Sequence, residues 1–125
     1  PSLAINSVPI TTYISRYYTN FNDYETALFY LDKSLKSNPY DIYTNYIIAR
    51  NYVQKNEFLL AKNKLQEIFE SSPKIESSTI LYLSVLGTLN RYDELLNIYP
   101  IIRDIDNKIV SDFYESNLKL SKKNN

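Results

Sequence analysis

The chain has 125 residues, with 14 basic and 14 acidic side chains, 13 tyrosines, one glycine, and no cysteine or histidine. The balanced charge gives no strong field for nucleic acid or an anionic membrane surface. The missing cysteine and histidine exclude disulfides, zinc fingers and catalysis by thiols or imidazoles. The length suits one domain with its own core. No apolar run approaches the roughly 18 residues that cross a bilayer, so we expect no membrane insertion in this segment.

The chain contains no methionine and begins Pro-Ser-Leu, which predicts a processed product or an excised domain of a longer protein. No signal-peptide pattern opens it. The plentiful asparagine, isoleucine and lysine are typical of an AT-rich genome, here taken as bacterial. The sequence does not decide the compartment, and either a cytoplasmic or a membrane-tethered soluble domain fits.

Hydrophobic periodicity, capping residues and prolines predict a series of helices along the chain. The expected ranges are about 8–19, 24–37, 42–54, 57–70, 76–89 and 92 onward, with a last amphipathic helix at about 107–120. Pro9 suits the start of the first helix, because its missing N–H costs nothing there. One face of that helix carries Ile10, Ile14, Tyr17 and Tyr18, and we expect Ile14 and Tyr18 at core positions.

Short polar turns and prolines separate these helices. Asn22 and Asn90 tolerate left-handed backbone, and Asp23 and Asp41 can cap the helices that follow them. Pro100 removes a backbone donor, so we expect a kink or a break in the sixth helix.

One pattern occurs twice at a spacing of 34 residues. Tyr18, Asn22, Tyr24, Ala27, Leu31 and Pro39 recur as Tyr52, Asn56, Phe58, Ala61, Leu65 and Pro73. A weaker third copy keeps Asn90, Tyr92, Leu95 and Tyr99 but lacks the alanine and the final proline. Self-similarity at this period predicts stacked helical hairpins. We expect the alanines to be buried where two helices cross, with the leucines beside them.

On these residues the chain resembles the tetratricopeptide repeat (TPR) family, whose pattern is W-x2-L-G-x2-Y…A-x3-F…P. The first copy reads Thr11, Ile14, Ser15, Tyr18, Ala27, Leu31 and Pro39, and the second reads Asn45, Ile48, Ala49, Tyr52, Ala61, Leu65 and Pro73. The Trp and Phe positions depart from the pattern. The resemblance implies an all-α, TPR-like superhelix of three antiparallel helical hairpins and a C-terminal capping helix. It implies one domain over 1–125, with repeats at about 8–41, 42–75 and 76–106 and the capping helix at about 107–120.

A second resemblance concerns the opening of the chain. PSLAINSVPITTYISRYY and the repeat with Asn38, Pro39 and Tyr40 look like the soluble C-terminal TPR domain of O-antigen ligase-like bacterial membrane proteins. This resemblance implies an accessory domain fused to membrane spans outside these residues. Since the ligase chemistry belongs to the membrane part, no catalytic residue carries over.

The TPR resemblance implies a partner site on the concave face, which the first helix of each hairpin lines. The site residues that we predict are Tyr13, Arg16, Tyr43, Tyr46 and Arg50. The register also places Thr12 on that face. Arg16 and Arg50 lie one repeat apart, and guanidinium groups pair with carboxylates. Tyrosine and arginine are enriched at binding hot spots, so the predicted ligand is a protein or peptide segment with acidic groups. Alternatively, both arginines are solvated or paired within the chain.

No enzyme, cofactor or metal site is expected. Acidic neighbours such as Asp93 and Glu94 point to different sides of a helix, and the single glycine, Gly87, supplies no phosphate-binding loop. The sequence therefore predicts a non-catalytic protein-interaction scaffold. Two alternatives stay open: the accessory domain of a glycan-handling membrane protein, and a structural piece that packs against the rest of its parent chain.

Overall fold

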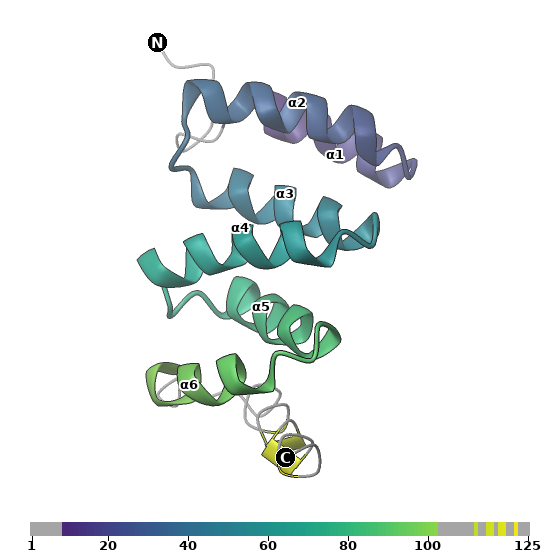
Figure 1. Ribbon diagram of the computed structural model, residues 1–125. Coiled ribbons are helices and arrows are strands. Elements are labelled where there is room, and N and C mark those ends of the chain that lie inside the picture. The colour runs from purple at the N-terminus through teal and green to yellow at the C-terminus, as the bar shows by residue number, and fades with distance from the viewer. Residues whose placement is uncertain (1–8, 103–111, 113–114, 117, 120–121, 123–125) are drawn as a thin grey trace. The chain divides into compact units, whose positions relative to one another are not determined.

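The computed structural model describes residues 9–102, 112, 115–116, 118–119 and 122. The helices are α1 (Ile10–Asn20), α2 (Tyr24–Ser37), α3 (Ile42–Gln54), α4 (Phe58–Ser71), α5 (Glu76–Thr88) and α6 (Tyr92–Ile102) (Figure 1). No strand occurs among the described residues, so the predicted all-α class is confirmed. The helix ends lie within about two residues of the predicted ones, the largest difference being the start of α1, where Pro9 precedes the helix. The chain divides into two compact units, Pro1–Lys64 and Leu65–Asn125.

The C-terminal predictions have mixed outcomes. The expected break of the sixth helix at Pro100 is wrong: α6 contains Pro100 and continues to Ile102. Ile102 is fully buried, and packing of this kind outweighs the loss of one backbone hydrogen bond. The helix expected at about 107–120 falls mainly on residues outside the described part. The single-domain organisation stays a prediction.

Each helical hairpin turns at an asparagine. Asn22, Asn56 and Asn90 have φ angles of 61°, 60° and 59°. The residue after each of them donates its N–H to a carbonyl five residues earlier, at 2.9 Å for Asp23 to Tyr18, 2.9 Å for Glu57 to Tyr52 and 2.8 Å for Arg91 to Leu86. These bonds are the long bond of a Schellman motif, which satisfies a free carbonyl at a helix end. Because asparagine tolerates the left-handed region, the repeated asparagine ends α1, α3 and α5.

Two aspartates begin the helices that follow turns. Asp23 Oδ1 accepts a hydrogen bond from the Thr26 N–H at 3.2 Å, and Asp41 Oδ2 accepts one from the Thr44 N–H at 2.7 Å. Each carboxylate satisfies a backbone donor that has no partner within its own helix. The predicted capping role of both residues is confirmed.

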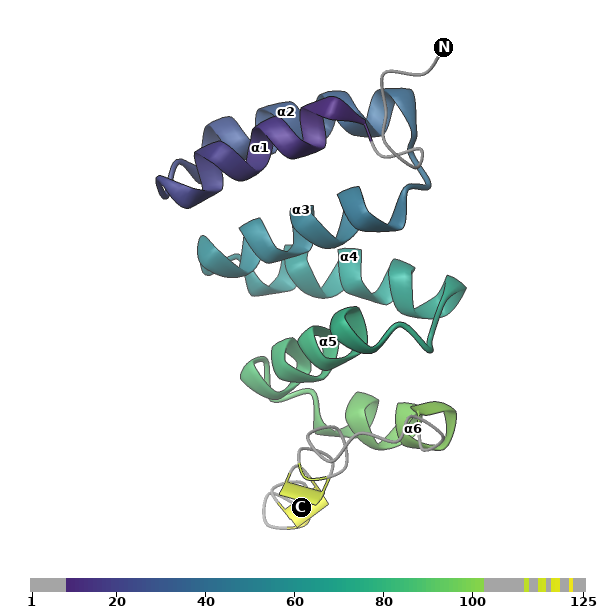
Figure 2. The same ribbon diagram turned by 180° about the vertical axis from the view of Figure 1, so that it is seen from behind.

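In the first unit, α1 and α2 form an antiparallel hairpin that packs on α3, and α1 lies alongside α2 in both views (Figures 1 and 2). Ala27 is fully buried, and Leu31 forms a core cluster with Ile47 and Ile48. The side chains packed around this cluster are Leu28, Leu35, Tyr43, Tyr46 and Tyr52. The predicted burial of the repeated alanines and leucines is confirmed, since Ala61 and Leu65 are also fully buried.

Two residues of α1 lie differently from the sequence prediction. Thr12 is fully buried, and its Oγ1 lies 2.8 Å from Thr44 Oγ1 of α3. Its predicted place on the partner face is wrong, because α3 covers it. Ile14 occupies a repeat position that we expected in the core, yet it is 39% exposed. That side of α1 is therefore only partly covered.

The second unit contains the C-terminal part of α4, with α5 and α6 in contact. The rings of Phe69 and Tyr82 lie 5.4 Å apart, and Leu95 takes the alanine position of the repeat with no exposed surface. Burial raises the pKa of Tyr82 to about 12, with smaller contributions from the charges of Glu94 and Glu70. Among the described residues, no helix has the length and apolar character that a membrane span requires.

Candidate functional site

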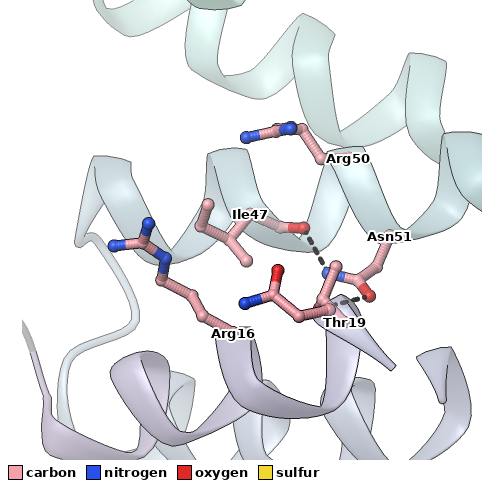
Figure 3. A pocket seen from close by; sticks show the side chains of 6 residues that line it. Arg16, Thr19, Ile47, Arg50 and Asn51 are labelled. Carbon is pink, nitrogen blue, oxygen red and sulfur yellow. Dashed lines mark hydrogen bonds between the residues drawn. The ribbon is translucent and has the colours of Figure 1, made fainter. Parts of the chain in front are cut away.

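Arg16 of α1 and Arg50 of α3 line one pocket in the first unit. The pocket has a volume of about 150 Å³, and its lining residues are Arg16, Thr19, Asn20, Ile47, Arg50 and Asn51. Figure 3 shows the two arginine side chains coming from facing helices, with Ile47 between them. The structure thus brings together the two cations that the repeat register selected.

The wall of this pocket is held by a buried amide. Asn51 is fully buried, and its Nδ2 donates to the Ile47 carbonyl at 2.9 Å. Its Oδ1 accepts a hydrogen bond from Thr19 Oγ1 of α1 at 3.1 Å (Figure 3). Because both ends of the amide are engaged, the orientation of Asn51 is fixed, and α1 is tied to α3 directly beside the arginines.

Both guanidinium groups are exposed. Within the described part of the chain, neither Arg16 nor Arg50 forms an ion pair with a carboxylate. Arg91 behaves differently, because its guanidinium lies 3.3 Å from a carboxylate oxygen of Glu94. The guanidinium carbon of Arg50 lies 5.9 Å from the centre of the Tyr46 ring, within the range of a cation–π contact. The pocket therefore carries two positive charges that no described carboxylate neutralises.

The predicted tyrosines lie near these helices but do not line the pocket. Tyr13 and Tyr43 form a ring pair with centres 6.1 Å apart and planes tilted by 32°. Tyr43 and Tyr46 are half-buried and pack against the core cluster, so part of each ring has a structural role. Tyr13 is the most exposed of the three. The five predicted residues are thus linked in pairs: Tyr13 with Tyr43, Arg50 with Tyr46, and Arg16 with Arg50.

Sequence reasoning missed Thr19 and Asn51, which fix the pocket wall. Both are polar, and the sequence pattern favoured exposure for polar side chains. The sequence separation of the polar pairs nevertheless carried a signal. Thr12 with Thr44 and Thr19 with Asn51 are both pairs separated by 32 residues, slightly less than one repeat. Polar residues at that offset mark where α1 meets α3.

The described residues offer no metal cluster, since no group of three acidic, histidine or cysteine side chains is placed to hold an ion. The chemistry that the pocket supports is recognition of an anion by two forked donors. Each fork can bind one carboxylate through two parallel hydrogen bonds.

Comparisons with known proteins identify the family of the chain. The family model for anaphase-promoting complex, cyclosome, subunit 3 matches residues 20–99, which is more than half of the chain. No curated protein and no solved structure matches it. The likeness to O-antigen ligase-like proteins stays a prediction. The matched residues, the all-helical structure and the 34-residue repeat agree, and the chain belongs to the anaphase-promoting complex, cyclosome, subunit 3 family of TPR-like helical repeats.

Proposed function

We propose that this chain is a non-catalytic interaction module that binds an extended acidic segment of a protein partner along α1 and α3. Its TPR-like family suggests a scaffold for protein partners, and repeat proteins of this kind bind through extended surfaces. The observation that carries the proposal is the pair Arg16 and Arg50. The two side chains line one pocket without a carboxylate partner in the described part of the chain.

Because neither arginine is paired with a described carboxylate, both guanidinium groups favour binding of an acidic ligand. A guanidinium group offers several N–H donors in one plane, which matches the two oxygens of a carboxylate. Arg16 and Arg50 have no described carboxylate to release first, so no existing ion pair opposes the new one. The wall beside them is held by Asn51 and Thr19, and such preorganisation lowers the entropy that binding costs.

The tyrosines supply flat surfaces beside these charges. Tyrosine combines a large apolar area with few rotatable bonds and a polar tip, which makes it a frequent anchor at interfaces. Tyr13 and Tyr43 already rest on each other, and Tyr46 rests under Arg50. A peptide that follows α1 and α3 would therefore meet rings that are already ordered.

Selection from a random peptide library tests the proposal without a known partner. Peptides of about 12 residues, displayed on phage, are selected on the wild-type chain, and the affinities of winners are measured by fluorescence anisotropy. We expect the selected peptides to be rich in Asp and Glu. Their affinity should fall about 30-fold, near 2 kcal/mol, in Arg50→Ala. Arg50→Lys should also weaken them, because lysine keeps the charge but loses the planar fork.

Arg91→Ala is the matched control, since Arg91 is the arginine paired with Glu94. It should leave peptide affinity unchanged. Two outcomes would exclude the pocket as the binding site. One is that the selected peptides lack acidic residues. The other is that wild type, Arg16→Ala and Arg50→Ala bind them with equal affinity.

A further inference from the structure

The acidic side chains of the first unit are engaged away from the pocket that Arg16 and Arg50 line. This unit contains five of them, and none lies before Pro9 in the sequence. Their partners are the Thr26 N–H for Asp23, the Thr44 N–H for Asp41, Lys36 for Asp32, and Lys55 for both Glu25 and Glu57. All five are described, and none of them lines the pocket. The two arginines therefore have no counterion among the acidic residues of their own unit.

The basic side chains of the same unit outnumber the acidic ones. There are seven against five, which leaves an excess of two positive charges. Lys36 and Lys55 pair with carboxylates, and Lys33 Nζ lies 4.6 Å from the centre of an aromatic ring. Arg16 and Arg50 instead share one pocket, whose other lining side chains are uncharged. The unit thus concentrates two positive charges at one place.

The rest of the pocket lining does not oppose an anion. The Asn51 amide oxygen accepts a hydrogen bond from the Thr19 hydroxyl at 3.1 Å, so this acceptor is satisfied inside the wall. The Ile47 carbonyl oxygen in turn accepts from Asn51 Nδ2 at 2.9 Å. Asn20 is exposed, and its amide can turn two N–H donors toward a ligand. The acceptors fixed in the wall are therefore already occupied, whereas donors face a bound anion.

A carboxylate and a phosphate monoester differ in charge and in shape. A carboxylate brings one negative charge and two oxygens in one plane, which fit one guanidinium fork. A phosphate monoester brings about 1.5 to 2 negative charges at pH 7 and three acceptor oxygens. The two arginine side chains come from facing helices (Figure 3), so one phosphate can receive a fork on each of two sides. The phosphate thus matches both the number of positive charges and their directions.

Two carboxylates of one peptide match the pocket less well. Side chains on the same side of an extended segment are two residues apart, so two acidic side chains must be held at once, and each loses rotamer freedom. Their charges also repel each other within a volume of about 150 Å³. A single phosphorylated side chain brings both charges without that repulsion.

We propose that this pocket binds the phosphate of a phosphorylated residue in a protein segment, with Arg16 and Arg50 on the same phosphate group. The proposal rests on the proposed function and names the acidic group that the partner presents. Clustered arginines are one of the recurring ways in which proteins recognise phosphorylated segments. Binding then depends on the phosphorylation state of the partner, since an unmodified hydroxyl brings no charge to the two arginines.

Three synthetic peptides test the proposal on the full chain. Each has about 11 residues of alanine and glycine and an amidated C-terminus, and the central residue is phosphoserine, glutamate or serine. Fluorescence anisotropy at pH 7.5 measures their affinities. We expect the phosphoserine peptide to bind about tenfold or more tightly than the glutamate peptide, because it engages both forks. The serine peptide should not bind.

Each single arginine variant should remove this preference. In Arg16→Ala and in Arg50→Ala only one fork remains, so phosphoserine should keep less than about a threefold advantage over glutamate. Arg91→Ala is the matched control, because Arg91 lies in the second unit and pairs with Glu94, and it should retain the full preference. Circular dichroism checks that each variant is folded.

The pH dependence of binding separates a phosphate from a carboxylate. The second pKa of a phosphate monoester is about 6, whereas the ordinary pKa of glutamate is about 4.3. The chain has no histidine, the side chain that ordinarily titrates between these values and pH 7.5, and the arginines are the titratable groups of the pocket lining. Lowering the pH from 7.5 to 5 should therefore weaken the phosphoserine peptide about fivefold and the glutamate peptide little.

Several outcomes would overturn the proposal. They are equal affinities for the phosphoserine and glutamate peptides, a preference that survives in both arginine variants, and no binding of any peptide. Inorganic phosphate that binds as tightly as the phosphoserine peptide would assign the pocket to the free ion, and vesicles of phosphatidic acid that bind more tightly would assign it to a lipid. The proposed function is judged by the selected acidic peptides. If those bind through the arginines while phosphoserine brings no gain, only the phosphate proposal fails.

Discussion

Replacing Ala61 by leucine tests whether the repeat register is read correctly. Ala61 has no exposed surface and holds the position that should sit at a helix crossing. Leucine adds three carbon atoms to a site with no exposed surface. Insertions of this size into a packed core force shifts of side chains and backbone, and typically cost about 1–3 kcal/mol. Since a domain of this kind has a stability of roughly 5–15 kcal/mol, the loss is a large share of the total.

The chain offers the reverse experiment in its third repeat. Leu95 stands at the same repeat position as Ala61 and is also fully buried. Leu95→Ala removes the three carbon atoms and leaves a cavity, at a cost of about 2–5 kcal/mol. Both exchanges should therefore destabilise, although they run in opposite directions. Helix propensity cannot produce this result, because alanine and leucine differ little in it.

Urea unfolding followed by circular dichroism measures both effects. With a slope of about 1–3 kcal/mol per molar urea, a loss of about 2 kcal/mol lowers the midpoint by roughly 1 M. Leu60→Ala is the control, because Leu60 is about half exposed beside Ala61, and it should change stability by less than about 0.5 kcal/mol. If the free energy of unfolding of Ala61→Leu lies within about 0.5 kcal/mol of the wild-type value, the assumed helix crossing at Ala61 is refuted.

Three further predictions address a cap, the pocket and a buried tyrosine. Asp41→Ala should cost about 1 kcal/mol in urea unfolding, because the Thr44 N–H loses its 2.7 Å acceptor, whereas Asp41→Asn should recover most of that; no difference between the two variants would exclude the cap. Arg50→Ala should leave the free energy of unfolding within about 0.5 kcal/mol of wild type, since its guanidinium is exposed, and a larger loss would give Arg50 a structural role. The pKa of Tyr82 is raised from 10.0 to about 12, so the unfolded chain loses this proton first as the pH rises. The ionisation of Tyr82 should therefore not change the free energy of unfolding below pH 10, and should lower it between pH 10 and about 12. In Tyr82→Phe the free energy of unfolding should fall less steeply with pH across that range. An equally steep fall in the variant and the wild type would contradict the raised pKa.

The sequence alone determined where the helices begin and end. Asn22, Asn56 and Asn90 supply the left-handed residue of each turn, and Asp23 and Asp41 supply the caps. These signals act between residues a few positions apart, so they can be recognised without knowing what lies nearby in space. The 34-residue period also identified the buried alanines and leucines, because stacked repeats bury the same positions in each copy.

Only the tertiary structure decided which sides of α1 are covered. Thr12 looked like a surface residue and is buried, whereas Ile14 looked like a core residue and is exposed. The same uncertainty affected the site: the register placed Arg16 and Arg50 on neighbouring helices, but the pocket between them depends on Thr19 and Asn51. Local backbone preferences are set by adjacent residues along the chain. Burial is set by whichever helix lies against a given side, and a side chain on α1 carries no information about that neighbour until the helices have packed.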